Sequence, residues 1–390
     1  MDLIFTEEQN ILRDMVRNLC EKHSSVDTVR AMENDPLGLD EALWNQIKET
    51  GILSMRLPEE YGGMGLNMID CAVVYEELGR GLAPGPYFAS GVLAVSAIDK
   101  AGSDEQKQEL LPALGSGEMI ITPAWLEPDN GFGPQGVQMR AEPSGNGFVL
   151  NGSKRHVFYA KAADQLLVLA RTGDELEAVD LFVVPCDAEG VELEQQLSMA
   201  SDTQYKVTFN EVMVSTAQRL GAEHSGWATW QECMYEASIL LAAQAAGAAG
   251  KALEVTAAYS KERHQFDKPL AAFQSLSHYM ADAYTVIEGA KVLVLEAAWN
   301  HTEGRSIKRL APMAKLAACN AFRDTTAKCE QIHGGYGFTL EYDIQLYFRR
   351  AKQWQLNWWD SRYLEELIAV EVLDQESGRT IPDPFTVDAA

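Results

Sequence analysis

The stretch Gln331-Ile332-His333-Gly334-Gly335-Tyr336-Gly337-Phe338 lies near the start of the last quarter of the chain. Apolar residues recur at helical spacing on both sides of it, over residues 307–329 and again over residues 344–351. Two adjacent glycines suit the end of a helix, because the residue after the last turn often takes a left-handed conformation that glycine adopts without strain. The pattern therefore predicts a helix that stops at this octet and another that soon follows it.

The composition indicates a large globular protein. The chain has 390 residues, of which 46% are hydrophobic and 23% charged, so it is long enough for two or three domains with a sizeable core. Its formal net charge is −25. Nucleic acids and anionic membrane surfaces attract clustered lysine and arginine, and this charge therefore argues against both as partners.

The cysteines and the apolar runs exclude several further classes. Six cysteines are scattered without a Cys-x-x-Cys spacing or a nearby histidine pattern, so we expect reduced thiols and neither a disulfide framework nor a metal site. The longest apolar run, residues 239–250, contains Gln244 and is too short to span a bilayer. The first residues do not show the basic and then apolar pattern of a signal peptide. We therefore expect a cytoplasmic protein with no membrane span.

Helical patterns dominate the first part of the chain. Thr6-Glu7-Glu8-Gln9 has the form of a capping box, and Leu12, Met15, Val16 and Leu19 then line one face. Further helical patterns cover residues 42–48, 69–78, 89–101 and 105–111. We expect an all-α N-terminal domain over residues 1–118.

Strand patterns replace the helical ones from Met119 onward. Short apolar runs bounded by turn residues favour strands at residues 165–170, 181–185, 206–209 and 212–214. Gly147-Phe148-Val149-Leu150-Asn151-Gly152 predicts a strand that enters an Asn-Gly turn. These patterns indicate a central antiparallel β domain over residues 119–226.

Helical periodicity returns at Trp227 and continues almost to the end. Small residues surround much of the segment 242–250, which predicts a slim helix inside a bundle. Residues 263–270 end this helix, and Phe273-Gln274 opens the next. We predict a C-terminal domain like a four-helix bundle over residues 227–390, ending in a polar arm at residues 374–390. The fold class is therefore α+β with several domains.

The order of these domains and two motifs resemble the acyl-CoA dehydrogenase family. The motifs are Arg263-x-x-Phe266-x-Lys268-Pro269-Leu270-x-x-Phe273-Gln274 and, later in the chain, Gln331-x-x-Gly334-Gly335-x-Gly337-Phe338. The resemblance covers essentially the whole chain, and it implies an FAD-dependent oxidoreductase that assembles as a tetramer. In this family a carboxylate removes the α-proton of an acyl-CoA thioester while the β-hydrogen leaves as hydride to the flavin. The product is a 2,3-enoyl-CoA, and the electrons pass to an electron-transfer acceptor.

The resemblance also implies a cofactor site. Arg263 would pair with the FAD pyrophosphate, for which a guanidinium fork is well suited, and Phe266 would pack near the adenine. Taken singly, each is better explained as a solvated surface arginine or a core phenylalanine, and only the joint spacing of the motif residues favours a cofactor site. A lone histidine beside two glycines is more often a cap or pocket residue, so we assign His333 no chemistry. The implied cofactor contacts, partly across a subunit boundary, are Arg263, Phe266, Gln274, Gln331, Gly334 and Gly335.

The chain departs from the family at the catalytic base. Many members carry an aromatic-Glu-Gly-Thr segment after Arg-x-Ala-Lys, and here Trp358 stands at the Glu position. Indole cannot accept a proton, so Trp358 cannot be the general base. Other members carry the base at the position of Ala237; here Glu236 is one residue early, a rotation of about 100° on a helix. Glu236 and Asp360 remain weak alternatives for a relocated base.

The flavin side of the β domain departs as well. The family's Thr-Glu-Pro-x-x-Gly-Ser-Asp loop appears as Leu126-Glu127-Pro128-Asp129-Asn130-Gly131-Phe132-Gly133. After Gly-Ser-Lys, Phe158 replaces a hydroxyl residue that hydrogen-bonds the flavin. A flavin on this β domain would therefore lose polar contacts at its reactive edge.

Together, these features resemble the subunit that lacks the base in heteromeric bacterial acyl-CoA dehydrogenases. We expect a chain that acts on an acyl-CoA with FAD and a homologous partner subunit in a heterotetramer. A homotetramer with a relocated base at Glu236 or Asp360 is the first alternative. A non-catalytic homologue that binds an acyl-CoA or a partner chain is the second.

Overall fold

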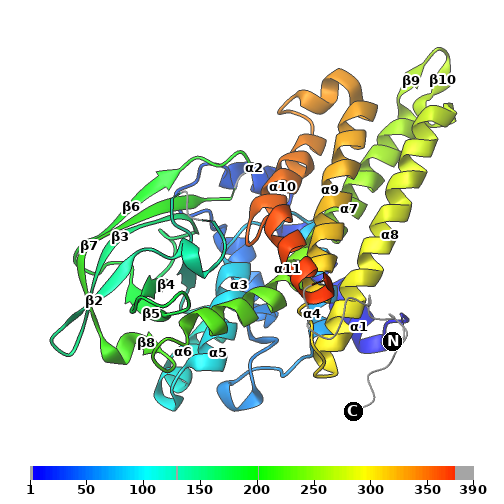
Figure 1. The fold of residues 1–390 in the computed structure, drawn as a ribbon. Coiled ribbons are helices and arrows are strands. Elements are labelled where there is room, and N and C mark those ends of the chain that lie inside the picture. The colour runs from blue at the N-terminus through cyan, green and yellow to red at the C-terminus, as the bar shows by residue number, and fades with distance from the viewer. Residues whose placement is uncertain (1–2, 129–130, 201, 374–390) are drawn as a thin grey trace. The chain divides into compact units, whose positions relative to one another are not determined.

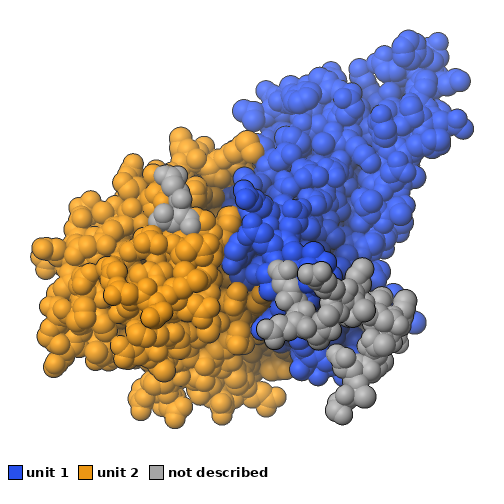
Figure 2. All heavy atoms as spheres, viewed as in Figure 1, with its two compact units in different colours: residues 1–5, 238–390 blue, residues 6–237 orange. Residues whose placement is uncertain are grey.

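The computed structural model describes residues 3–128, 131–200 and 202–373. The chain forms two compact units, one comprising Met1–Phe5 and Ser238–Ala390 and the other Thr6–Ala237, shown in different colours in Figure 2. The polar arm predicted at residues 374–390 lies outside the described residues.

The unit formed by residues 6–237 begins with helices. Thr6 caps the first of them: its hydroxyl accepts from the Gln9 amide at 3.2 Å, and the Gln9 side chain accepts from the Thr6 amide at 3.1 Å, which confirms the capping box. Short 3-10 turns lie at Ile52–Ser54 (η1) and Glu59–Tyr61 (η2), and a π-helical segment at Ala89–Ala94 (η3). The α-helices are α1 (Glu7–His23), α2 (Val26–Met32), α3 (Glu41–Glu49), α4 (Met68–Arg80), α5 (Val95–Ala101) and α6 (Asp104–Ser116).

A sheet follows these helices in the same unit (Figure 1). Its strand order is β6-β7-β3-β2-β4-β5-β8, with β1 beside β4. Neighbours pair antiparallel except β1 with β4 and a single bridge between β2 and β4. Buried side chains such as Phe182 and Phe209 fill its core. The strands are β1 (Ile121–Ala124), β2 (Arg140–Ser144), β3 (Gly147–Phe158), β4 (Gln165–Arg171), β5 (Val179–Pro185), β6 (Val191–Gln196), β7 (Gln204–Ser215) and β8 (Arg219–Leu220).

The Asn-Gly turn predicted at Asn151 and Gly152 is wrong. Strand β3 continues through both residues, and its register with β7 shifts there, so that Asn151 alone stands opposite two residues of β7. The Asn151 side chain accepts from the Glu211 amide at 2.8 Å, and Gly152 takes a φ of 148°. Asn and Gly thus form a bulge rather than a turn, and the strands predicted at residues 206–209 and 212–214 belong to one strand.

The C-terminal helices make up most of the unit that contains residues 238–390. α7 (Gly226–Glu262) begins in the unit of residues 6–237 and ends in this one, and the alanines of residues 242–249 on this helix are buried, as the small side chains predicted. α9 packs against α8, α10 and α11, and Figure 1 shows α8 and α9 running side by side. The other elements are the hairpin β9 (His264–Gln265) and β10 (Lys268–Pro269), η6 (Leu270–Ala272), α8 (Gln274–Thr302), α9 (Leu310–His333), η7 (Gly334–Phe338), α10 (Ile344–Leu356) and α11 (Ser361–Leu373).

Two predictions about these helices are confirmed. α9 ends at His333, directly before the paired glycines, and α7 ends at Glu262, directly before the Arg263 motif. In the part of the chain that the structure describes, no helix has both the length and the apolar character needed to cross a membrane.

Candidate functional site

A groove lies between the C-terminal ends of α7 and α9. Its volume is about 470 Å³. One wall comes from the last turn of α7 and the hairpin after it, and the other from the last turn of α9 and η7. Its lining includes Tyr259, Arg263, His333, Gly334, Gly335 and Tyr336. The groove thus joins the two sequence motifs, which are far apart along the chain.

Arg263 supplies the positive charge of this groove. Its guanidinium carbon lies 5.7 Å from the centroid of the Tyr336 ring, a cation–π contact. Within the described ranges, no carboxylate pairs with this guanidinium, although the chain as a whole carries a net charge of −25. A planar cation that keeps its donors available is suited to bind a phosphate or a carboxylate.

The glycine turn forms the opposite wall of the groove. Gly334 takes a φ of 64°, and its amide donates to the carbonyls of Glu330 and Gln331, which caps α9. Among the described residues, no heavy atom lies within 4 Å of the point where a Cβ would stand at Gly334 or Gly335. The turn is therefore a helix cap, and it also leaves its backbone open to a ligand beside Arg263.

Aromatic rings support both walls. The His333 ring stacks on the Tyr259 ring with centroids 4.2 Å apart and an interplanar angle of 19°. Tyr342 packs edge-on against both rings and lies 5.0 Å from the Tyr336 ring. Nδ1 of His333 lies 2.8 Å from the Cys329 carbonyl, and burial lowers the pKa of His333. The Tyr336 ring thus packs against this aromatic cluster through Tyr342, and Arg263 in turn contacts the Tyr336 ring.

The structure brings only part of the predicted cofactor set together. Arg263, Gly334 and Gly335 line the same groove. Gln331 lies one turn earlier on α9 and is exposed, and Gln274 is the exposed first residue of α8. Phe266 lies at the hairpin tip with 86% of its surface exposed, and its ring packs on Phe273 at 6.3 Å. The roles of these three remain predictions.

Three groove residues were not assigned to the site from the sequence. Tyr259 precedes Arg263 by four residues at the end of α7, and this spacing is the signal that could have placed both on one face. Tyr336 stands inside the glycine motif, but its contact with Arg263 depends on the meeting of two distant helices. His333 was assigned no chemistry because a lone histidine beside two glycines is more often a cap or pocket residue, and its stack on the Tyr259 ring depends on a distant part of the chain.

The turn between α10 and α11 carries Trp358, the residue that the family resemblance implies at the position of the base. Trp358 and Trp359 are both buried and take φ values of 60° and 116°, a region that glycine favours. Nζ of the fully buried Lys315 donates to the Asn357 carbonyl at 2.9 Å and to the Trp359 carbonyl. Burial lowers the pKa of Lys315. The turn is thus held by an ammonium group and carries no carboxylate at residue 358.

Asp360 has a structural contact of its own. Its Oδ1 accepts from the Tyr363 amide at 2.9 Å, so it caps the first turn of α11. The side chain is only partly exposed. One oxygen of this carboxylate therefore satisfies a helix terminus.

Glu236 lies in the unit of residues 6–237, on the part of α7 that belongs to that unit. Its Oε2 accepts from Arg56 Nη2 and from Ser96 Oγ, both at 2.7 Å, and its Oε1 lies 2.9 Å from Lys100 Nζ. Only 5% of Glu236 is exposed. Two cations and a hydroxyl thus surround this carboxylate.

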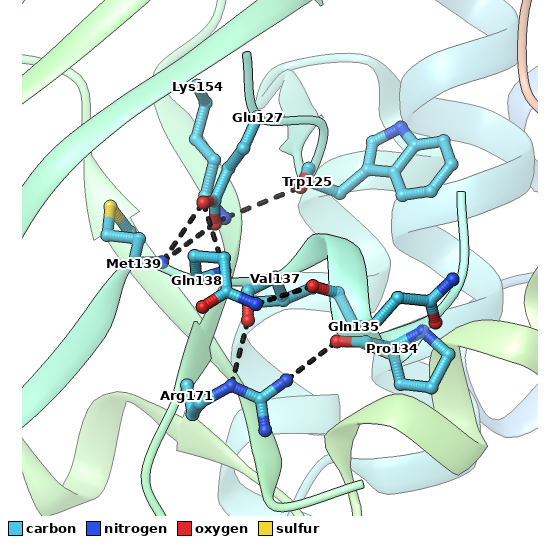
Figure 3. A network of polar contacts seen from close by, with 9 residues as sticks. All are labelled: Trp125, Glu127, Pro134, Gln135, Val137, Gln138, Met139, Lys154 and Arg171. Carbon is cyan, nitrogen blue, oxygen red and sulfur yellow. Dashed lines mark hydrogen bonds and ion pairs between the residues drawn. The ribbon is translucent and has the colours of Figure 1, made fainter. Parts of the chain in front are cut away.

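A second buried charge network braces the loop after β1 (Figure 3). Lys154 is fully buried and donates to Glu127 at 2.7 Å, while Glu127 also accepts from the amides of Gln138 and Met139 at 3.0 Å. Burial lowers the pKa of Lys154, and Glu127 opposes that shift.

Arg171 braces the same loop from strand β4. Its guanidinium donates to the carbonyls of Val137 at 2.9 Å and Pro134 at 2.7 Å, as Figure 3 shows. A buried ion pair and hydrogen bonds to backbone groups therefore hold the shape of this loop.

The side chains at the flavin positions of this unit are apolar. Trp125 packs on Trp230 at 5.4 Å and on Phe132 at 6.0 Å. Phe158 is buried, and its carbonyl accepts from the Thr122 hydroxyl at 2.6 Å. Neither Phe132 nor Phe158 has a hydroxyl group to offer a flavin ring.

The residues present therefore fit one end of an FAD. The unpaired guanidinium of Arg263 and the open Gly334-Gly335 backbone suit its pyrophosphate. Leu126, Phe132 and Phe158 lack the polar groups expected around its ring. No group of metal-binding side chains occurs among the described residues.

Comparisons with known proteins identify the family. The chain matches the N-terminal domain of acyl-CoA dehydrogenases over residues 6–118, the middle domain over residues 123–212 and the C-terminal domain over residues 224–356. It is 30% identical over 359 residues to the short-chain-specific acyl-CoA dehydrogenase of Clostridium acetobutylicum, covering 90% of this chain and 94% of the relative.

Solved structures agree with this match. Butyryl-CoA dehydrogenase from Megasphaera elsdenii superposes with a TM-score of 0.87 at 28% identity, over 95% of this chain and 99% of that one. A chain of the ChsE4-ChsE5 complex from Mycobacterium tuberculosis superposes with a TM-score of 0.86 at 27% identity, over 95% and 98%. The predicted order of helical, β and helical domains is confirmed, and the chain belongs to the acyl-CoA dehydrogenase family, a family of oxidoreductases that use FAD.

Proposed function

We propose that this chain is the subunit without a catalytic base in a heteromeric acyl-CoA dehydrogenase. The complex oxidises an acyl-CoA thioester to a 2,3-enoyl-CoA, and this chain contributes domains at residues 1–118, 119–226 and 227–390. The observation that carries the proposal is Trp358, an indole held in a fixed turn where the reaction needs a carboxylate.

The two alternative bases are already engaged. The Glu236 carboxylate contacts Arg56, Ser96 and Lys100, and it would have to leave all three to approach a substrate. Asp360 caps α11. These contacts favour a partner-supplied base over a homotetramer that uses either residue.

The groove supports a role in holding the cofactor. In this proposal Arg263 binds the FAD pyrophosphate, with Phe266, Gln274, Gln331, Gly334 and Gly335 around the rest of the dinucleotide across a subunit boundary. The apolar residues Phe132 and Phe158 favour a flavin ring held by the partner. A related structure is itself described as a complex of two chains, ChsE4 and ChsE5. The assembly we propose is a heterotetramer.

The complex would pass its electrons to an electron-transfer protein. A structure 30% identical to this chain is described under the electron transferring flavoprotein of Acidaminococcus fermentans, which supports an acceptor of this kind. All six cysteines are free thiols, in keeping with a cytoplasmic protein.

Purification with and without a partner tests the proposal. The chain alone, supplied with FAD, a series of CoA thioesters and an artificial electron acceptor, should not turn over. Addition of a homologue that carries the base should restore turnover, and replacing that partner's glutamate by glutamine should abolish it. Turnover by the isolated chain would refute the proposal, as would unchanged activity after removal of the partner's base.

A further inference from the structure

The His333 ring occupies a special place in the groove around Arg263. One face of the ring stacks on Tyr259, Nδ1 contacts the Cys329 carbonyl, and the residue is 4% exposed. It nevertheless lines the groove together with Arg263 and Gly334. An edge of the imidazole is therefore available to a ligand while the rest of the ring is fixed.

The Cys329 carbonyl determines which nitrogen carries the proton. A carbonyl oxygen can only accept a hydrogen bond, so Nδ1, 2.8 Å away, must donate to it. Burial lowers the pKa of His333, which keeps the ring neutral at neutral pH. A neutral imidazole has a single N–H, and its other nitrogen, Nε2, is then an acceptor. Among residues 3–128, 131–200 and 202–373, Nε2 makes no hydrogen bond.

The groove thus offers two complementary groups. Arg263 presents donors with a positive charge, and His333 presents a neutral acceptor on the opposite wall. A simple anion uses only the first group. A nucleotide uses both, because it combines phosphates with neutral donors, namely the hydroxyls of its ribose and the exocyclic amine of adenine.

We propose that His333 is a specificity-determining residue of this groove, whose Nε2 accepts a hydrogen bond from a neutral donor of the nucleotide that Arg263 holds by its phosphates. This proposal rests on the proposed function, in which that nucleotide is the ADP half of FAD. The shared chemistry is an N–H or O–H donor, which either the adenine amine or the ribose 2′-hydroxyl supplies.

Calorimetric titration of the flavin-depleted complex with three nucleotides tests this. ADP has both donors, IDP has a carbonyl in place of the adenine amine, and 2′-deoxy-ADP lacks one ribose hydroxyl. His333→Asn keeps a donor for the Cys329 carbonyl and lacks Nε2. We expect it to weaken ADP binding about 3- to 10-fold, the effect of one neutral hydrogen bond. One of the two analogues lacks the donor that His333 recognises, and this analogue should bind the wild-type protein more weakly than ADP does. His333→Asn should not weaken the binding of that analogue any further.

Two controls separate recognition from folding. His224→Asn changes an exposed histidine outside the groove and should leave all three affinities unchanged. His333→Phe keeps the stack on Tyr259 and should weaken ADP binding as His333→Asn does, while melting temperatures report on the fold. Equal weakening of all three nucleotides by His333→Asn, or no weakening of ADP, would overturn the assignment. If the wild-type complex bound neither ADP nor FAD, the proposed function would fail with it.

Discussion

The groove around Arg263 and the turn around Trp358 lie in the same helical unit, yet they differ in almost every property. The groove has an unpaired cation, an open glycine backbone and a buried aromatic support. The turn has two buried indoles, a buried ammonium group that binds only carbonyls, and no free carboxylate among its residues 357–360. The difference teaches that one helical unit can leave a cation open to a ligand in one place and close a turn with apolar side chains in another.

Glu236 provides the largest test, because it is the most plausible base outside the turn. Glu236→Gln leaves Arg56 and Lys100 beside a neutral amide, and we expect the free energy of unfolding to fall by about 3 kcal/mol. The activity of the folded complex should not change. Urea unfolding and steady-state rates per folded complex measure the two effects.

Glu232→Gln is the matched control for Glu236→Gln. Glu232 is largely exposed and lies 3.7 Å from the same Lys100, so its loss should change stability by less than about 1 kcal/mol. A stable Glu236→Gln protein with no activity would mean that Glu236 is the base after all.

Lys315 tests whether the turn is held independently of the groove. Lys315→Met leaves the carbonyls of Asn357 and Trp359 without their donor, and we expect a loss of about 2 kcal/mol in unfolding free energy. FAD affinity should remain within twofold, about the error of the measurement. Lys308→Met, at an exposed lysine just before α9, should be neutral. An equal loss of stability in Lys315→Met and Lys308→Met would mean that the contacts of Lys315 with the two carbonyls do not stabilise the turn.

Arg263 tests the groove itself. Arg263→Ala removes a charged donor from the proposed pyrophosphate site and should weaken FAD binding by the complex about 10- to 100-fold, with little change in stability. Arg305→Ala is the control, because Arg305 also lies over an aromatic ring, that of Trp299 at 4.5 Å, but outside the groove. Unchanged flavin content in Arg263→Ala would refute the assignment.

The smallest effect is the pH dependence that His333 contributes. Its pKa is lowered in the folded state, so the unfolded chain binds the proton more readily. The stability that His333 contributes is therefore complete above the unfolded pKa of about 6.5 and declines as the pH falls below it, by at most about 1.4 kcal/mol per unit. Unfolding of wild type and His333→Phe between pH 5 and pH 8 measures how the difference in unfolding free energy changes with pH, and we expect that difference to be constant above about pH 7 and to shift as the pH falls below it. A difference constant over that whole range would show that His333 does not titrate there.

Local patterns predicted much of the fold. The capping box at Thr6, the helix end before Gly334 and the buried small residues of α7 all depend on neighbours in the chain, and each was found from spacing alone. The prediction of a turn at Asn151-Gly152 was wrong because the same two residues also suit a β-bulge. Only the pairing with the opposite strand, β7, determines whether they form a turn or a bulge.

The site was predictable only where its residues belong to a motif. Arg263 and the Gly334-Gly335 pair were found and share a groove. Lys315, Arg56 and Lys100 were not, because their roles depend on partners between 42 and 180 residues away along the chain, such as Asn357 and Glu236. The absence of a base at residue 358 could be recognised in the sequence, whereas the engagement of Glu236 could not.

Trp359 has a consequence for substitutions in the turn after α10. Its backbone takes a φ of 116°, a region that glycine favours. Its side chain is nevertheless completely buried, so Trp359→Gly would remove an entire indole from the core, at a cost of about 3–5 kcal/mol. A carboxylate introduced at residue 358 would therefore have to be accommodated beside this buried indole.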